Sequence, residues 1–343
     1  MSAGVASAAS PGLWALAWRR LRRDRVAVAC MFVVAAFLAL MLASMTGLVA
    51  ADWEREAGIS YARPALTARV LNQPAAESEA PAQQRAPAAD LSDIDPLAPR
   101  YDEWQRRAEE LRATLPARSE TLPLGGDQWG RDVLKKTIKG SEVSITVGLA
   151  AALIATLLGA LLGALAGYWG GRLGDLLEWL YNVFTSIPYI LLILAFAAVL
   201  GRGVTTIILI LGLTGWTGVY RLVRAEYLKH REREYVLAAK AIGVSHTKRM
   251  FAHILPNTSH VVLVQFSLLV VAFIKTEVIL SFLGLGVPVG VVSWGTMLAE
   301  SQNELVMGKW WQLAVVGAAM AALVTALSLL TDSMRDALDP KLR

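Results

Sequence analysis

Residues 143–166 read VSITVGLAAALIATLLGALLGALA and contain no charged side chain. A helix needs ~20 apolar residues to cross the hydrocarbon core of a bilayer, and this run is long enough. Five further apolar stretches of spanning length lie at 26–50, 176–200, 204–220, 261–283 and 310–330. Each has to be helical in lipid, because its backbone groups can be hydrogen-bonded only within the segment. The sequence therefore predicts an all-α integral membrane protein with about six transmembrane helices.

The composition agrees with a membrane environment and excludes several classes of protein. Of the 343 residues, 55% are apolar and 18% are charged, which is too apolar for a soluble domain of this length. Cys30 is the single cysteine and lies in an apolar run, so the chain can form neither a disulfide framework nor a thiolate metal site. The net charge of +5 is unevenly distributed, and we interpret it as setting orientation rather than as binding nucleic acid.

Basic residues set the expected orientation, because lysine and arginine accumulate in cytoplasmic loops. Residues 1–25 contain five arginines and are expected to be cytoplasmic. The following run, 26–50, is longer than the core of a secretory signal, so we interpret it as an uncleaved first helix. Alternation of the spans then places the basic loop 221–260 and the C-terminal residues 331–343 on the same side. We therefore expect both termini in the cytoplasm.

The segment between the first two spans, residues 51–140, is expected to lie outside the membrane on the opposite face. Residues 75–99 contain almost no large apolar side chains and are expected to form a mobile linker. Residues 101–113 show helical spacing and predict a short surface helix. The remaining part, 141–343, is expected to be a core that contains helices two to six. The second predicted helix of the chain has glycines at 159, 163 and 167, and this spacing predicts a closely packed neighbouring helix.

The loop at 221–257 has the most informative sequence. The alanine-rich stretch Glu234–Ala241 predicts a short helix, which Gly243 ends. Residues 248–255 predict a second short helix that stops at Pro256 before the next span. The small side chains would allow close approach of a protein partner, and nearby Lys240 offers charge to acidic groups. On physical grounds alone, two interfacial helices beside anionic lipid headgroups explain the pattern equally well.

Several residues in this loop carry a resemblance that separates these alternatives. Ala238 and Ala239, then Gly243, then the run His253-Ile254-Leu255-Pro256 resemble the coupling-loop signature of ATP-binding-cassette importer permeases. Segments 123–144, 280–297 and 335–343 resemble signatures of the dipeptide, oligopeptide and nickel class of these permeases. The resemblance covers most of 13–50 and 123–343 but not 52–121. Leu237 replaces the glutamate of the signature, and Gly126 replaces the usual threonine.

The resemblance implies a permease subunit of the bacterial cytoplasmic (inner) membrane. Such a subunit forms half of a translocation path with a second, homologous permease subunit. It works with two ATP-binding-cassette ATPase subunits and a periplasmic solute-binding protein. Short peptides are the implied substrates, with nickel chelates or oligosaccharides as alternatives. We call residues 235–257 the coupling segment, and its predicted contact residues are Tyr235, Ala238, Ala239, Lys240, Gly243, His253, Leu255 and Pro256.

The chain itself is predicted to be no enzyme. Its sequence contains no phosphate-binding loop, no zinc-protease pair and no serine-nucleophile turn, so Mg-ATP would be used by the partner subunits. No cofactor and no metal are expected on this chain, and the four histidines have no spacing typical of a metal site.

Two ionisable residues lie inside the fifth predicted span, where an uncompensated charge is costly. Lys275 and Glu277 are two positions apart and should point to different faces. We predict that they contact the translocation path or a subunit interface, or lie at the external end of the span. An ion-gradient transporter would also explain them, but matched Gly- or Pro-interrupted helices in two halves, typical of such carriers, are missing.

Overall fold

The computed structural model describes residues 13–65, 67, 100–114 and 118–338. The chain divides into two compact units, a large unit made from 1–51 and 137–343 and a small unit made from 52–136. The predicted linker 75–99 and the last residues of the predicted C-terminal signature lie outside the described residues.

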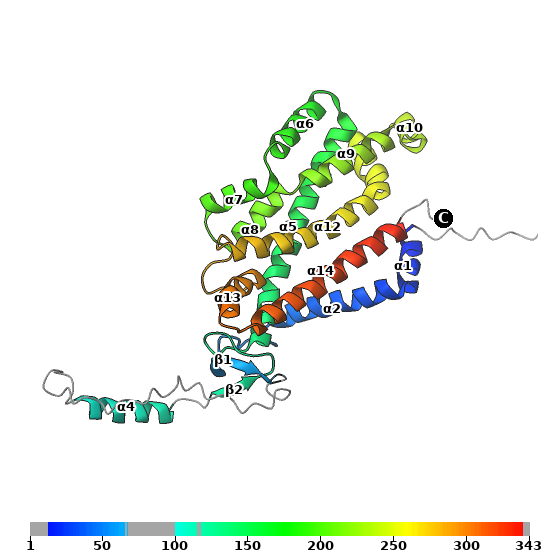
Figure 1. The fold of residues 1–343 in the computed structure, drawn as a ribbon. Coiled ribbons are helices and arrows are strands. Elements are labelled where there is room, and N and C mark those ends of the chain that lie inside the picture. The colour runs from blue at the N-terminus through cyan, green and yellow to red at the C-terminus, as the bar shows by residue number, and fades with distance from the viewer. Residues whose placement is uncertain (1–12, 66, 68–99, 115–117, 339–343) are drawn as a thin grey trace, which may run out of the picture. The chain divides into compact units, whose positions relative to one another are not determined.

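In the described part of the chain, five helical stretches are long and apolar enough to cross a membrane, and a bent pair supplies a sixth (Figure 1). This confirms the prediction of about six transmembrane helices. The five are α2 (Arg25–Met45), α5 (Val133–Trp169), Val204–Arg231, His246–Phe282 and α14 (Trp311–Leu338). Val204–Arg231 consists of α8 (Val204–Thr214) and α9 (Thr217–Arg231). His246–Phe282 consists of α11 (His246–Lys248), a π-helix (Arg249–Ile254) and α12 (Leu255–Phe282).

The span predicted at 176–200 is not a single helix. It is divided between α6 (Gly171–Thr185) and α7 (Tyr189–Leu200), whose axes are bent by 82°. Pro188 lies at the break, as the residue that precedes α7. Proline has no backbone N–H and disfavours the helical conformation in the residue before it, so the helix ends there. The third predicted span is therefore a bent pair of helices rather than one continuous helix.

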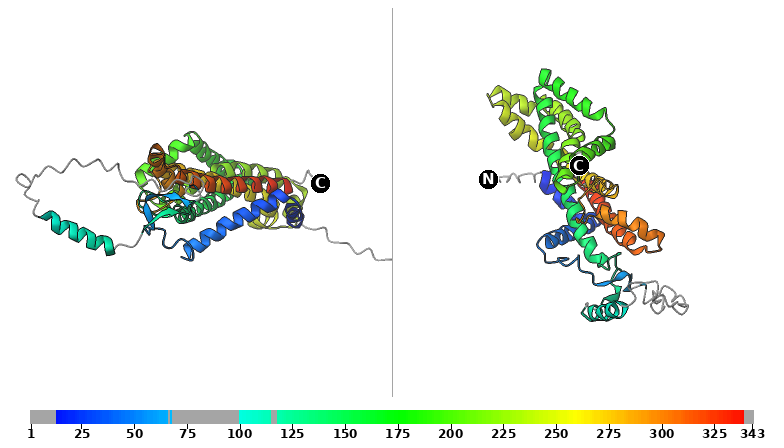
Figure 2. Two further views of the ribbon diagram at one scale, coloured as in Figure 1. Left: turned by 60° about the horizontal axis from the view of Figure 1, so that its bottom comes forward. Right: turned by 90° about the vertical axis from the view of Figure 1, so that its left-hand side faces the viewer.

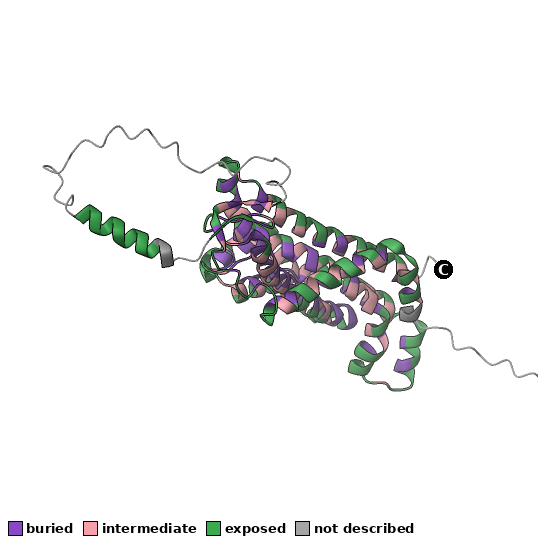
Figure 3. Cartoon of the chain, turned by 90° about the horizontal axis from the view of Figure 1, so that it is seen from below, coloured by how far each residue is buried: buried purple, intermediate pink, exposed green. Residues whose placement is uncertain are grey.

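Many residues of the spanning helices are exposed or only half-buried (Figure 3), and large apolar side chains are among them, as expected for helices in contact with lipid. In the most apolar 18-residue stretch of α2, only 17% is buried inside the unit. The same share is buried in the most apolar stretch of α14. Phe32 on α2 and Val199 on α7 are 73% and 82% exposed. The C-terminal helix α14 packs against α2 and against α1 (Leu13–Arg23), so the two ends of the unit lie side by side (Figure 1, Figure 2).

The predicted glycine face of α5 contacts another helix closely. A Cβ atom on Gly159 would lie 2.5 Å from the carbonyl oxygen of Trp216, and one on Gly163 would lie 2.7 Å from that of Tyr220. On Gly167 it would lie 2.6 Å from the carbonyl oxygen of Arg224. All three oxygens belong to α9 or the residue before it, so the prediction of a tight helical neighbour is confirmed.

The small unit contains a two-stranded parallel sheet that the sequence did not predict. Strand β1 (Gly58–Pro64) pairs with β2 (Ser119–Leu122), and α4 (Tyr101–Thr114) confirms the predicted surface helix. A Cβ atom on Gly126 would lie 3.2 Å from the Cβ of Ala62 and 3.3 Å from the Cδ1 of Leu122. Any side chain at position 126 would therefore be crowded by residues of both strands, which a glycine avoids.

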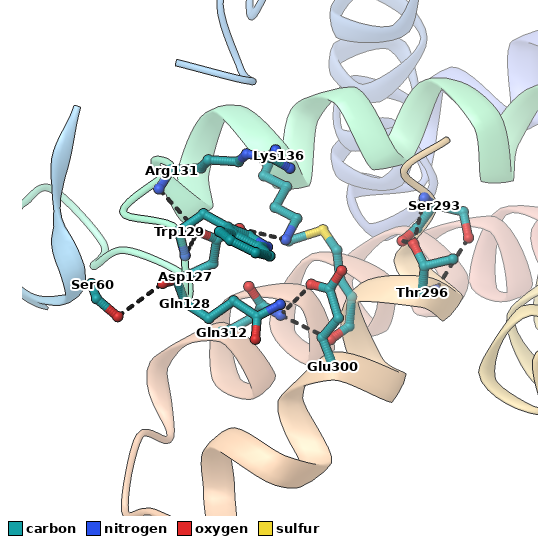
Figure 4. A network of polar contacts seen from close by, with 11 residues as sticks. Ser60, Asp127, Gln128, Trp129, Arg131, Lys136, Ser293, Thr296, Glu300 and Gln312 are labelled. Carbon is teal, nitrogen blue, oxygen red and sulfur yellow. Dashed lines mark hydrogen bonds and ion pairs between the residues drawn. The ribbon is translucent and has the colours of Figure 1, made fainter. Parts of the chain in front are cut away.

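A buried carboxylate organises the loop that leads into α5. Asp127 is 0% exposed, and its Oδ1 accepts hydrogen bonds from the backbone N–H groups of Trp129 and Arg131, each at 2.9 Å. Its Oδ2 accepts from Nζ of Lys136, which is 1% exposed, at 2.7 Å (Figure 4). Asp132 accepts from the N–H of Leu134 at 2.8 Å, inside the first turn of α5. The resemblance at 123–144 therefore covers a motif with a structural role within the small unit.

Candidate functional site

The loop predicted at 221–257 begins later than expected. The helix continues through Arg231, because Val223 and Tyr227 are 0% exposed and pack, one turn apart, in an apolar cluster with Tyr168 of α5. The Tyr227 hydroxyl donates to the carbonyl oxygen of Met250 at 3.1 Å. Residues 221–231 therefore extend the fourth span rather than form part of a loop.

The short helix predicted at Glu234–Ala241 is confirmed as α10. Val236 and Ala239 are 2% and 5% exposed and point inward, and Val236 joins the cluster that contains Met250 and Ile254. The opposite side of α10 is apolar but uncovered, with Leu237 47% exposed and Ile242, next after the helix, 81% exposed. We call this surface, made by Leu237, Ala238, Ala241 and Ile242, the docking face.

Ala238 and Ala239, both predicted to contact a partner, lie on different sides of α10. Ala238 lies on the docking face, whereas Ala239 is buried beneath the helix, so that a partner could not contact its side chain directly. Lys240 is exposed. Gly243 has a φ of +78°, a conformation that residues with a side chain rarely adopt, which confirms that it ends the helix. The sequence predicted the element correctly but not which alanine faces outward.

Tyr235 joins the start of α10 to the end of α9. Its hydroxyl lies 2.8 Å from Nδ1 of His230, within hydrogen-bond distance. Burial raises the pKa of Tyr235 above its ordinary value, so the phenol stays protonated at neutral pH. This contact holds α10 against the span that precedes it.

Pro256 does not stop a helix, so that prediction was wrong. It lies in the first turn of α12, directly after the π-helix Arg249–Ile254, and the helical path runs unbroken from His246 to Phe282. In the π-helix the N–H of Leu255 donates to the carbonyl oxygen of Met250, five residues earlier. This wider turn accommodates a proline, whose ring would clash with the carbonyl four residues before it in a regular α-helix. His253 and Leu255 are half-buried, and Pro256 is exposed.

Lys275 and Glu277 lie on different faces of α12. Lys275 is exposed, whereas Glu277 is 0% exposed and enclosed by its own chain. Glu277 Oε2 accepts from the Ser144 hydroxyl at 2.6 Å, and Oε1 accepts from the Ser281 hydroxyl at 2.7 Å. The Glu277 side chain is thus enclosed by its own chain and reaches no path or partner surface directly, and it lies within the last two turns of α12.

The Glu277 contacts extend to a helix that the sequence analysis missed, α13 (Trp294–Val306). Ser144 Oγ also accepts from the N–H of Trp294 at 3.2 Å, and Trp294 Nε1 donates to the carbonyl oxygen of Thr137 at 3.1 Å. Ser293 and Thr296 form a capping box at the start of α13, and Gln312 Nε2 donates to Glu300 at 3.1 Å (Figure 4). A serine three residues before a threonine, directly preceding an apolar run, was the signal that could have located this helix start.

Replacing Glu277 with glutamine is expected to lower the unfolding temperature of the purified protein. The amide has one acceptor atom where the carboxylate has two, so either Ser144 or Ser281 must reorient, at about 1–3 kcal/mol. Thermal unfolding in detergent measures the change, and Lys275→Gln, on the exposed face, serves as the control. An equal effect of the two substitutions would contradict the structural role of Glu277.

The sequence is similar to those of known proteins. The family described as "Binding-protein-dependent transport system inner membrane component" matches residues 159–343. The dipeptide transport system permease protein DppC of Bacillus subtilis is 34% identical over 230 residues, which is 65% of this chain and 72% of that protein. The oligopeptide permease OppC of the same organism is 35% identical over 248 residues, 72% of this chain and 80% of that protein. The oligopeptide permease OppC of Escherichia coli K12 is 38% identical over 217 residues, which is 63% of this chain and 72% of that protein.

Proposed function

Because the chain belongs to the family of binding-protein-dependent transport system inner-membrane components, we propose that it forms half of the translocation path of an ATP-driven importer for short peptides. The peptide substrate is supported by the relatives, which are named as dipeptide and oligopeptide permeases. The other half of the path is a second, homologous permease subunit. A solute-binding protein delivers the peptide on the periplasmic side of a bacterial inner membrane.

The observation that carries the mechanism is the docking face on α10. Leu237 and Ile242 expose apolar surface that is not part of a spanning helix. Such a surface in water is typical of a protein contact. We propose that it docks on an ATP-binding-cassette ATPase, one of two in the complex, and that both termini of this chain lie on the same, cytoplasmic side. The ATPases bind Mg-ATP, and this chain binds no cofactor.

The base of α10 supports its role as a lever. Val236 packs with Met250 and Ile254, and Tyr227 donates to the carbonyl oxygen of Met250. These contacts tie α10 to the ends of two spans, Val204–Arg231 and His246–Phe282. A displacement of the docking face when the ATPases close on ATP would therefore move both spans together. Close packing transmits such a shift because the interior resists compression.

Co-purification tests this function directly. The full chain is expressed with its second permease subunit and with the two ATPases, and the complex is reconstituted in liposomes with the binding protein inside or outside. We expect ATP hydrolysis to rise when a dipeptide or oligopeptide is added with the binding protein. Stimulation by nickel chelates or by oligosaccharides, with none by peptides, would replace the peptide assignment by one of these alternatives.

Gly243→Trp is expected to abolish ATP-driven uptake or prevent assembly, although the variant reaches the membrane. The bulky ring would stand beside Ile242 and separate the docking face from its partner. Uptake and ATP hydrolysis are measured on the reconstituted complex.

Gly201→Trp is the matched control for this substitution. Gly201 also has a φ of +78° and open space around it, so the backbone strain is the same, but it follows α7 and lies outside the coupling segment. Normal uptake by Gly243→Trp, or equal loss of uptake in both variants, would contradict a docking role for the coupling segment.

A further inference from the structure

A pocket of about 260 Å³ lies beneath α10, at a point where three spanning stretches end or begin. Tyr168 and Trp169 contribute from the last turn of α5, and Arg231 contributes from the last residue of α9. His246 and Arg249 contribute from the start of His246–Phe282. Tyr168 and Trp169 directly follow the apolar run 143–166, so we expect the pocket to lie at the depth of the membrane–water interface.

Arg249 is the unusual residue of this pocket. It is 7% exposed, and its buried Nε atom has no hydrogen-bond partner. Its guanidinium lies 6.0 Å from the centre of the Tyr168 ring, at the outer limit of a cation–π contact. Within the described residues, no carboxylate forms an ion pair with it. Buried charges in proteins are normally paired, so a buried guanidinium without an anion indicates that an external anion completes the site.

The other charges around the pocket leave it positive. Arg231 Nε donates to Glu232 at 3.0 Å, so these two lining residues largely neutralise each other. Lys240 also lines the pocket and forms no ion pair in the part of the chain that the structure describes. The hydroxyl of Tyr168 lies 3.1 Å from Nδ1 of His246, which fixes the ring against which Arg249 rests. Arg249 and Lys240 therefore supply two positive charges that are not balanced locally.

We propose that this pocket holds the phosphate group of an anionic phospholipid headgroup. A guanidinium and an ammonium match phosphate oxygens, and basic pockets between spanning helices are typical sites for lipid headgroups. Trp169 is 45% exposed beside the pocket, and tryptophan is enriched at this depth of the bilayer. Leu237, at the edge of the docking face, also forms part of the pocket wall, so the pocket lacks the carboxylate that a glutamate at this position would bring.

Lipid titration tests the proposal. The full chain is purified in mild detergent, depleted of lipid and titrated with short-chain phosphatidylglycerol, and bound copies are counted by native mass spectrometry. We expect one tightly held copy whose affinity falls at least tenfold in Arg249→Leu. Lys248→Leu removes the neighbouring exposed charge, which does not line the pocket, and should change the affinity less than twofold. Equal binding by the wild type and Arg249→Leu, or equal losses in both variants, would overturn the proposal.

Two further arms separate lipid from other anions. Phosphatidylcholine and inorganic phosphate, each at the concentration used for phosphatidylglycerol, should not displace the tightly held copy; displacement by inorganic phosphate would overturn the lipid assignment. If Arg249→Leu kept the lipid but no longer co-purified with the ATPases, the pocket would belong to a protein partner instead.

Leu237→Glu provides a second variant that does not remove a buried group. It places a carboxylate on the wall of the same pocket, where it can pair with Arg249. We expect at least a tenfold loss of phosphatidylglycerol affinity together with an unchanged or higher unfolding temperature. Wild-type lipid affinity in a folded Leu237→Glu protein would overturn the proposal, even if Arg249→Leu fails to fold.

Discussion

Lys136→Met should destabilise the small unit by about 3–5 kcal/mol, because it leaves the Asp127 carboxylate buried without its cation. The two side chains are 1% and 0% exposed and lie 2.7 Å apart. Asp127 also fixes the backbone of Trp129 and Arg131, so the loop that leads into α5 should open with it. Cleavage after Arg131 by trypsin, followed against urea concentration and quantified by mass spectrometry, measures the loss.

The adjacent lysine is a matched control for this experiment. Lys135 pairs with Asp52 at 2.7 Å, but these side chains are 41% and 50% exposed. An exposed pair of this kind contributes no more than about 1 kcal/mol, so Lys135→Met should change little. The same substitution at neighbouring positions thus separates a buried ion pair from an exposed one. If the two variants are equally stable, Lys136 does not support the loop as described.

Gly163→Leu should prevent α5 and α9 from packing and greatly reduce the yield of folded protein. Even the first atom of the new side chain would lie 2.7 Å from the Tyr220 carbonyl oxygen and 3.1 Å from the Arg224 nitrogen. Backbone atoms cannot rotate away as a side chain can, so the cost should exceed the ~1–3 kcal/mol usual for overpacking. Size-exclusion chromatography after heating in detergent gives the loss of folded protein.

Gly218→Leu tests whether the effect depends on helix contact rather than on loss of a glycine. Gly218 lies on α9, the partner helix, and a Cβ atom there would meet no atom within 4 Å. Leucine also favours the helical conformation more than glycine does. We therefore expect near-normal thermal stability, and a loss as large as that of Gly163→Leu would contradict the close approach of α5 and α9.

The number of spans could be predicted from sequence because hydropathy depends on composition alone, which is independent of the rest of the fold. The bend at Pro188 could not be predicted in this way, since an apolar run has the same hydropathy whether the helix is straight or broken. Pro256 led to the opposite error, because the π-helix before it accommodates the ring. Gly159, Gly163 and Gly167 predicted a neighbour correctly, but only the structure identifies it as α9.

The candidate site was predictable as an element but not in detail. Small residues and Gly243 indicated the short helix, whereas the inward position of Ala239 depends on packing against residues that follow it. Arg249 could not be distinguished from other basic residues, because its burial depends on Tyr168, which is distant in sequence. Glu277 likewise receives hydrogen bonds from Ser144, a residue of another span.

The parallel pairing of β1 with β2 has a consequence for how the chain can vary. The connection 65–118 leaves β1 after Pro64 and returns at Ser119, which is paired with Gly58, so both of its ends are held by the same two-stranded sheet. Lengthening such an excursion costs only the entropy of closing a longer loop, about 0.6 kcal/mol for each doubling of its length. A segment of almost any size, including a purification tag or a fluorescent domain, could therefore be accepted there while the spans keep their contacts.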